Sequence, residues 1–224
     1  MKEVLIVCRM MEAETRAALE QTGSAAEVIW MDKGLHNKPE HLREELQAAM
    51  DAAEAERHPD RVLLGYGFCG NAMDGLRAGN YELILPRIDD CITMFIGSRQ
   101  RKAELEGGVG TMFQTSDWTE STDKSLLGAR DRLIEKYGED DGQYLYDMMY
   151  GNYRRIAVLD THCYPLEPVV EQAEAVAAAL GFECRVFDAS NDFLRRLLAG
   201  PWDDGSFIVK SPGEVITGRD LRIE

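Results

Sequence analysis

The sequence predicts an α/β fold, in which a mainly parallel β-sheet is flanked by helices. The first observation is a continuous apolar run at residues 4–8, which is typical of a parallel strand buried on both faces. The second is that similar runs alternate with helical stretches rich in Ala, Glu and Leu, such as residues 39–57. Because each half of the chain repeats the β-α-β order, two similar lobes with a cleft at the carboxyl ends of the strands are a further expectation.

The first part of the chain alternates strands and helices, and we expect it to form an N-terminal α/β lobe at residues 1–106. Pro39 opens the long helix, because its φ is fixed near the helical value. The N–H group that proline lacks would have no intrahelical partner in the first turn. The elements expected in this lobe are strands at residues 4–8, 27–31, 62–67 and 83–86 and helices at about 12–21, 39–57 and 91–105.

Two further segments follow. Residues 107–151 begin with a glycine-rich stretch and continue into polar helices, so we expect a mostly helical insertion or lid. Residues 152–224 return to the α/β pattern, and they either form a lobe of their own or pack with residues 1–106 as one domain. The elements expected here are helices at about 121–137, 139–150, 167–180 and 192–199 and strands at 155–160, 183–187 and 207–209.

The charge of the chain argues against two classes of partner. With 40 acidic and 25 basic residues, its net charge of −15 repels nucleic acids and anionic membrane surfaces. The first residues are too few and too acidic for a signal peptide, and no apolar run is long enough to span a bilayer. We therefore expect a cytoplasmic protein that binds neither nucleic acid nor membrane.

The cysteines are the main chemical signal. They are five in number and widely spaced, which favours ligands, nucleophiles or buried apolar residues over disulfides. Ligands of open parallel sheets bind at the carboxyl ends of the strands, where four of these thiols are expected: Cys8, Cys69, Cys91 and Cys163. Cys184 falls inside a predicted strand, where a free cysteine acts as a small buried hydrophobic residue.

Thiolates are the preferred ligands of soft and borderline metals, so we predict that Cys8, Cys69 and Cys91 bind zinc or iron. His162 and Cys163 are weaker candidates, because adjacent side chains often point apart. The alternative for each thiol is a place in the core, since free cysteine is among the most buried residue types.

The residues around Cys69 are expected to bind a small-molecule ligand. Tyr66, Gly67 and Asn71 belong to a glycine-rich turn, where the backbone can approach a ligand closely. Trp118 could cover such a ligand or fill the core instead.

The sequence before Cys91 also contains polar candidates. Asp90 can cap the helix that begins at Cys91, and the amides of its first turn would lower the pKa of the thiol. The neighbouring carboxylates oppose this effect, and Arg87 could offset them. Glu12, four residues after Cys8, either turns into the same cleft or faces solvent.

Several common motifs are absent from the sequence. There is no three-glycine dinucleotide fingerprint, no Walker-type phosphate loop and no Gly-x-Ser-x-Gly elbow. No Cys-x-x-Cys pair occurs either, which excludes the usual zinc-finger spacing.

Blocks of sequence distributed over nearly the whole chain resemble the DUF1638 family. These blocks lie at residues 35–42, 64–71, 86–91, 110–113 with Trp118, 152–160 and 212–214. The resemblance implies a relation to uncharacterised proteins of anaerobic bacteria and methanogenic archaea. Genes for these proteins often lie near those for corrinoid-dependent methyltransferases. The resemblance implies that cysteine is usual at positions 8, 69 and 91, whereas His162-Cys163 departs from the small residues expected there.

We therefore expect a metal-binding protein, either an enzyme or an accessory factor in corrinoid-linked one-carbon metabolism and methyl transfer. The resemblance implies a corrinoid protein or a methyltransferase as its partner. One alternative is a non-catalytic module that binds a corrinoid or another small molecule, although the Asp-x-His-x-x-Gly stretch of a corrinoid lower ligand is missing. The other alternative is that the protein is a metal-free cysteine-dependent enzyme.

Overall fold

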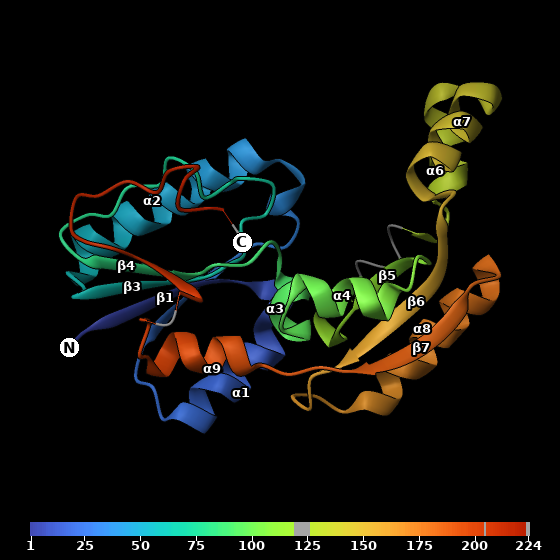
Figure 1. Ribbon diagram of the computed structural model, residues 1–224. Coiled ribbons are helices and arrows are strands. Elements are labelled where there is room, and N and C mark those ends of the chain that lie inside the picture. The colour runs from blue at the N-terminus through green and yellow to red at the C-terminus, as the bar shows by residue number, and fades with distance from the viewer. Residues whose placement is uncertain (119–125, 204, 223–224) are drawn as a thin grey trace. The chain divides into compact units, whose positions relative to one another are not determined.

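The computed structural model describes residues 1–118, 126–203 and 205–222. The chain divides into two units (Figure 1). One consists of Met1–Ser98 with Asn191–Glu224, and the other is Arg99–Ser190. Each unit has its own sheet of mostly parallel strands with interleaved helices, which confirms the predicted α/β fold.

The first unit contains a five-stranded sheet with the order β2-β1-β3-β4-β8. Four neighbouring strands are parallel, and β8 pairs antiparallel with β4 at one edge. The central strands are buried on both faces, which explains why they have continuous apolar runs instead of alternating ones. The strands are β1 (Glu3–Cys8), β2 (Glu27–Met31), β3 (Arg61–Gly65), β4 (Glu82–Pro86) and β8 (Phe207–Lys210).

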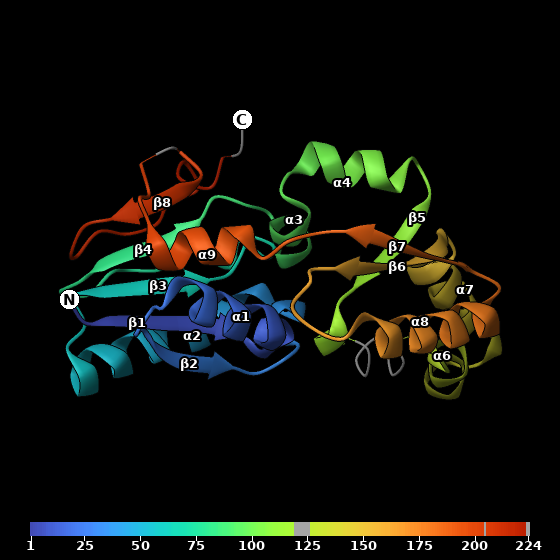
Figure 2. The ribbon, with the colours of Figure 1, turned by 90° about the horizontal axis from the view of Figure 1, so that it is seen from below.

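Helices cover both faces of this sheet. Helix α2 (Pro39–Arg57) lies on one face, and α1 (Glu12–Thr22) and α9 (Asp192–Ala199) lie together on the other (Figures 1 and 2). Each long helix buries one apolar stripe, as the spacing of Leu42, Leu46 and Met50 in α2 illustrates. The short elements of this unit are η1 (Arg9–Met11), η2 (Leu35–Asn37) and α3 (Cys91–Ile96).

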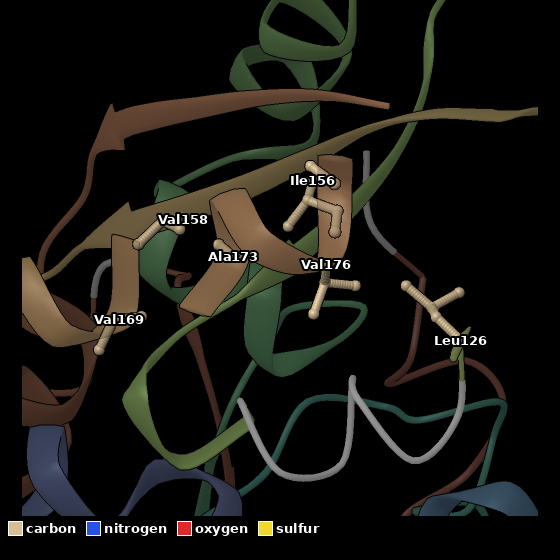
Figure 3. Packing of buried hydrophobic residues seen from close by; sticks show 7 residues of the cluster. Leu126, Ile156, Val158, Val169, Ala173 and Val176 are labelled. Atoms are coloured by element: carbon tan, nitrogen blue, oxygen red, sulfur yellow. The ribbon is translucent and has the colours of Figure 1, made fainter. Parts of the chain in front are cut away.

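The second unit has a parallel three-stranded sheet with the order β5-β6-β7. Val169, Ala173 and Val176 of α8 pack against Ile156 and Val158 of β6, forming the core of this unit (Figure 3). The strands are β5 (Gly110–Gln114), β6 (Tyr153–Asp160) and β7 (Glu183–Asp188), and the helices are α4 (Arg99–Glu106), η3 (Ser116–Trp118), α6 (Ala129–Tyr137), α7 (Glu139–Tyr150) and α8 (Leu166–Leu180).

Helices α6 and α7 form a hairpin that precedes β6 (Figure 1). Gly142 lets the two helices approach closely, since a Cβ atom at this position would lie 2.5 Å from the Cα of Ile134. This contact makes a glycine necessary in a helix interior, where it is otherwise unfavourable.

Arg155 stabilises the amino-terminal end of the second sheet. Its side chain is 6% exposed, and its Nε lies 3.0 Å from Oε2 of Glu183 on the neighbouring strand. Its Nη1 donates to the carbonyl oxygens of Leu105 and Glu106, at 3.1 and 3.4 Å. The guanidinium therefore joins β6, β7 and the end of α4 through three charge-assisted hydrogen bonds.

The observed elements differ from the predicted ones in two places. The helix expected at about 91–105 is two helices, because Gly97 ends α3 with a φ of 100° and donates its N–H to the carbonyl of Thr93. The segment 107–151 contains β5 as well as helices, because its apolar residues pair with β6. The start of the helix expected at 121–137 lies outside the described residues.

The division into units also differs from the predicted segments 1–106, 107–151 and 152–224. The second unit already begins at Arg99, since α4 is joined to β6 by Arg155. Residues from Asn191 onward return to the first unit, where α9 packs against α1 and β8 pairs with β4. No helix among the described residues has the length and apolar character needed to cross a membrane.

Candidate functional site

Three cysteines lie at the carboxyl ends of neighbouring strands in the first unit. Cys8 is the last residue of β1, Cys69 follows β3, and Cys91 begins α3 after β4. Since β1, β3 and β4 are parallel neighbours, their carboxyl ends meet at one edge of the sheet. The predicted convergence of strand ends is therefore present in the fold.

The loop after β3 is hydrogen-bonded to the loop after β4. The backbone N–H groups of Phe68 and Cys69 donate to the carbonyls of Ile88 and Asp89, at 2.8 and 2.9 Å. Gly67 permits this approach, because a Cβ atom there would lie 2.6 Å from the backbone nitrogen of Asp90. These contacts bring Cys69 close to the start of α3.

Cys91 is the first residue of α3, as the sequence predicts. Asp90 is the N-cap residue, and its Oδ1 accepts a hydrogen bond of 2.6 Å from the backbone N–H of Thr93. Cys8 plays a similar role in η1, where its sulfur accepts from the N–H of Met10 at 3.4 Å. Both thiols are thus held at the start of helical turns.

We call Cys8, Cys69 and Cys91 the thiol cluster, since charges among them contribute to the raised pKa values of Cys69 and Cys91. Burial, together with the charges of Asp90 and Cys8, raises the pKa of Cys69 to about 12. Burial also raises the pKa of Cys91 well above its ordinary value, with further contributions from Cys69, Asp90 and Cys8. Cys69 and Cys91 are consequently protonated at neutral pH in the ligand-free protein.

Tyr66 adds a polar group to this cluster. Its side chain is 3% exposed, and its hydroxyl has no hydrogen-bond partner of normal geometry. Burial raises the pKa of Tyr66, and the nearby Cys8 and Cys69 raise it as well. A side-chain hydrogen bond with Cys8 contributes to this shift, so the Tyr66 hydroxyl lies against the thiol of Cys8.

The fit of a metal ion to this cluster rests on the chemistry of its side chains. Three cysteine thiolates are suitable ligands for zinc or iron. Among the described residues, no group of three or more His, Cys, Asp and Glu side chains is already arranged around a common metal position. The thiol side chains would therefore have to rotate toward one another for all three to bind one ion.

Two other predicted ligand-binding residues, Arg87 and Glu12, have contacts within the first unit. Arg87 donates to the carbonyl oxygens of Gly205 and Asp220, at 3.0 and 2.7 Å, and so anchors the C-terminal segment. Its guanidinium is thus directed to backbone oxygens of the C-terminal segment. Glu12 forms ion pairs with Arg16 and Arg9, at 2.6 and 3.3 Å. These partners hold its carboxylate along the surface of α1.

Asn71 lies in a groove beside the thiol cluster. It adopts a left-handed conformation with a φ of 69°, as does Gly70 before it. The groove has a volume of about 720 Å³ and lies between this turn and the start of α2. The charged and ionisable residues that line it were not among the sequence candidates, although the first three of them fall in the block at residues 35–42. They are Lys38, Glu40, His41, Arg43, Glu44 and Asp74.

Trp118 and the pair His162-Cys163 belong to the second unit. The sulfur of Cys163 donates to the carbonyl of Thr161 at 3.1 Å. Cys184 lies within β7, as predicted, and is partly buried against the core of that unit.

His162 lies between two carboxylates at the ends of β6 and β7. Its Nε2 is 2.9 Å from Asp188 and its Nδ1 is 3.3 Å from Asp160, and its φ of 57° is unusual for a residue other than glycine. Sequence inspection missed this cluster, because the pairing of Asp160 with Asp188 depends on the register of β6 and β7.

We predict that Asp188→Asn lowers the pKa of His162. The hydrogen bond to Asp188, followed by the charge of Asp160, raises this pKa above its ordinary value. The stabilisation from this cluster is therefore complete at pH values below about 6.5 and is lost as the pH rises through the raised pKa. NMR titration of the imidazole protons measures the change, and an unaltered pKa in the variant would contradict the assigned hydrogen bond.

A family model described as "Protein of unknown function (DUF1638)" matches residues 30–198. The match confirms the resemblance and includes Cys69 and Cys91, but it begins after Cys8 and ends before residues 212–214. It is thus shorter than the nearly complete coverage expected from the sequence blocks. No curated protein and no solved structure matches the chain.

Proposed function

Since the chain belongs to the DUF1638 family, whose function is unknown, we propose a function from its own side chains: it binds zinc or iron through Cys8, Cys69 and Cys91. The observation that supports the proposal is that these three cysteines follow neighbouring parallel strands, whose carboxyl ends meet at one edge of the sheet. Thiolates from separate loops of one sheet edge are a suitable ligand set for either metal.

The environment of the thiols favours metal binding over metal-free thiol catalysis. A nucleophilic cysteine needs a lowered pKa, so that it is a thiolate at neutral pH. The raised pKa values of Cys69 and Cys91 have the opposite effect. A bound cation would offset the repulsion between the thiolates and compensate for their burial, and it would displace their protons.

The groove beside Cys69 supports a small-molecule ligand near the metal. Gly70 and Asn71 directly follow the thiol and form one wall of the groove. A metal bound by three thiolates leaves a coordination position, where it can lower the pKa of a substrate thiol and make it a nucleophile. A role as enzyme or accessory factor in corrinoid-linked methyl transfer, with a corrinoid protein or methyltransferase as partner, stays a prediction from the family resemblance.

The test is the metal content of cysteine variants after anaerobic purification. We expect Cys69→Ser and Cys91→Ser each to lose most of the bound zinc or iron, because a serine hydroxyl is a harder and far less acidic ligand. Cys163→Ser is the matched control, since this partly buried thiol lies in the second unit. Its metal content should equal that of the wild type.

Circular dichroism of each variant separates loss of a ligand from loss of the fold. Equal metal content in the wild type and all three variants would refute the proposal and leave the cysteines as partly buried packing residues. Selective loss in Cys163→Ser would place the metal in the second unit, with His162 as the neighbouring candidate ligand.

A further inference from the structure

Helix α7 has an apolar surface that the described residues leave uncovered. Tyr144, Met148 and Met149 are 65%, 60% and 55% exposed, and Gly142 is the only buried residue of the helix. Single exposed apolar side chains are common on protein surfaces, whereas several on one short helix mark an interaction surface.

Two of these three side chains, Tyr144 and Met148, form a stripe on the side of α7 opposite to α6, whereas Met149 lies on the same side as Gly142. Gly142 contacts the backbone of α6 at Ile134, which fixes the inner side of the helix. With about 100° of rotation per residue, Tyr144 and Met148 lie roughly 200° and 240° around the helix from Gly142. We call the surface formed by these two residues and the carboxylates beside them the outer face of α7.

Carboxylates border this stripe on both sides. The same rotation places Asp140 and Asp147 on one side of Tyr144 and Met148, and Asp141 on the other. The sequence of α7 contains four acidic residues and neither Lys nor Arg.

Arg130 of α6 is directed to the seam between the two helices. Nε of Arg130 donates to Oε1 of Gln143 at 2.5 Å, and Nε2 of Gln143 donates to Asp147 at 2.9 Å. Lys136 instead lies 4.9 Å from the ring of Tyr137. The outer face therefore combines an apolar centre with an acidic border.

The negative charge of the outer face indicates which kind of partner it binds. A second copy related by a twofold axis would bring the same acidic border against itself, because the two halves of such an interface are identical. Nucleic acids and anionic membranes are also negatively charged, so the acidic border repels them. A basic partner has the complementary charge.

We propose that the outer face of α7 binds an amphipathic, basic helix of another protein. The apolar side of that helix packs on Tyr144 and Met148, and its Lys or Arg side chains pair with Asp140, Asp141 and Asp147. The flexible side chain of Met148 adapts to the apolar residues of the partner.

A synthetic peptide pair tests this proposal on the full chain. The probe is a fluorescein-labelled peptide of about 18 residues in which Leu and Lys form an amphipathic helix, and its counterpart has Glu in place of Lys. We expect fluorescence anisotropy to show binding of the Leu/Lys peptide at physiological salt and no binding of the Leu/Glu peptide. Hydrogen exchange should show protection within residues 139–150 when the Leu/Lys peptide is bound.

Two variants distinguish the outer face from general attraction to an acidic chain. The double variant Tyr144→Ser with Met148→Ser should raise the Kd of the Leu/Lys peptide by about tenfold or more. The control Val186→Ser removes an apolar side chain that is 43% exposed on β7, and should leave the Kd unchanged. Circular dichroism verifies that both variants keep their helix content.

Three results would overturn the proposal. The first is absent binding, or equal binding of both peptides. The second is the same Kd for the double variant, the control and the wild type, which would attribute binding to the net charge of −15 alone. The third is self-association of the wild type in sedimentation velocity that the double variant lacks, which would assign the outer face to a second copy of the chain.

Discussion

Gly67→Ala is expected to destabilise the first unit by roughly 3 kcal/mol or more and to separate the loops that bear Cys69 and Cys91. The new Cβ atom would lie 2.6 Å from the nitrogen and 2.7 Å from the Cα of Asp90. Backbone atoms cannot move aside as the end of a flexible side chain can. The loops must therefore move apart, which breaks the hydrogen bonds from Phe68 and Cys69 to Ile88 and Asp89.

Urea unfolding measures this loss, and hydrogen exchange of the Phe68 and Cys69 amides reports the two bonds directly. Gly218→Ala is the matched control in the same unit, since its nearest neighbour is Asp74 Oδ2 at an ordinary 3.8 Å. A Gly67→Ala variant with the same urea midpoint as Gly218→Ala would disprove the close packing of the two loops.

Arg155→Gln should destabilise the second unit by roughly 2–3 kcal/mol. The substitution removes a buried guanidinium that bonds Glu183 and the carbonyls of Leu105 and Glu106. Removing one partner of a buried charged network is costly, because the remaining polar groups lose their bonds without regaining full hydration.

Arg185→Gln is the control for this effect, because Arg185 contacts the same Glu183 but is 53% exposed. An exposed ion pair contributes at most about 1 kcal/mol, so this variant should unfold at nearly the wild-type urea concentration. Hydrogen exchange of the β6 amides provides a local readout. Equal destabilisation by the two substitutions would mean that burial of Arg155 contributes nothing.

Much of the first unit could be predicted, because its signals are local in sequence. The continuous apolar runs of β1, β3 and β4 identify buried parallel strands, and the order of these strands places Cys8, Cys69 and Cys91 at one edge. Asp90 was also predictable as a helix cap from its position before Cys91.

The other features depend on contacts between residues distant in sequence. Arg87 looked like a neutralising group for the carboxylates near Cys91, but its partners are carbonyls more than one hundred residues further along the chain. The groove beside Asn71 requires the start of α2 to pack near the loop after β3. The raised pKa of Cys91 follows from burial, which outweighs the effect of its position at a helix start.

The return of the chain to the first unit has a consequence for its synthesis. Strand β4 ends at Pro86, whereas its edge partner β8 begins only at Phe207, after the whole second unit. At roughly 5–20 residues per second, the ribosome needs on the order of ten seconds to make the intervening stretch. Throughout that interval β4 has an unpaired edge, and the surface beneath α9 is uncovered. A nascent chain stalled before residue 191 would therefore expose a strand edge and an apolar surface to other chains, both of which favour aggregation.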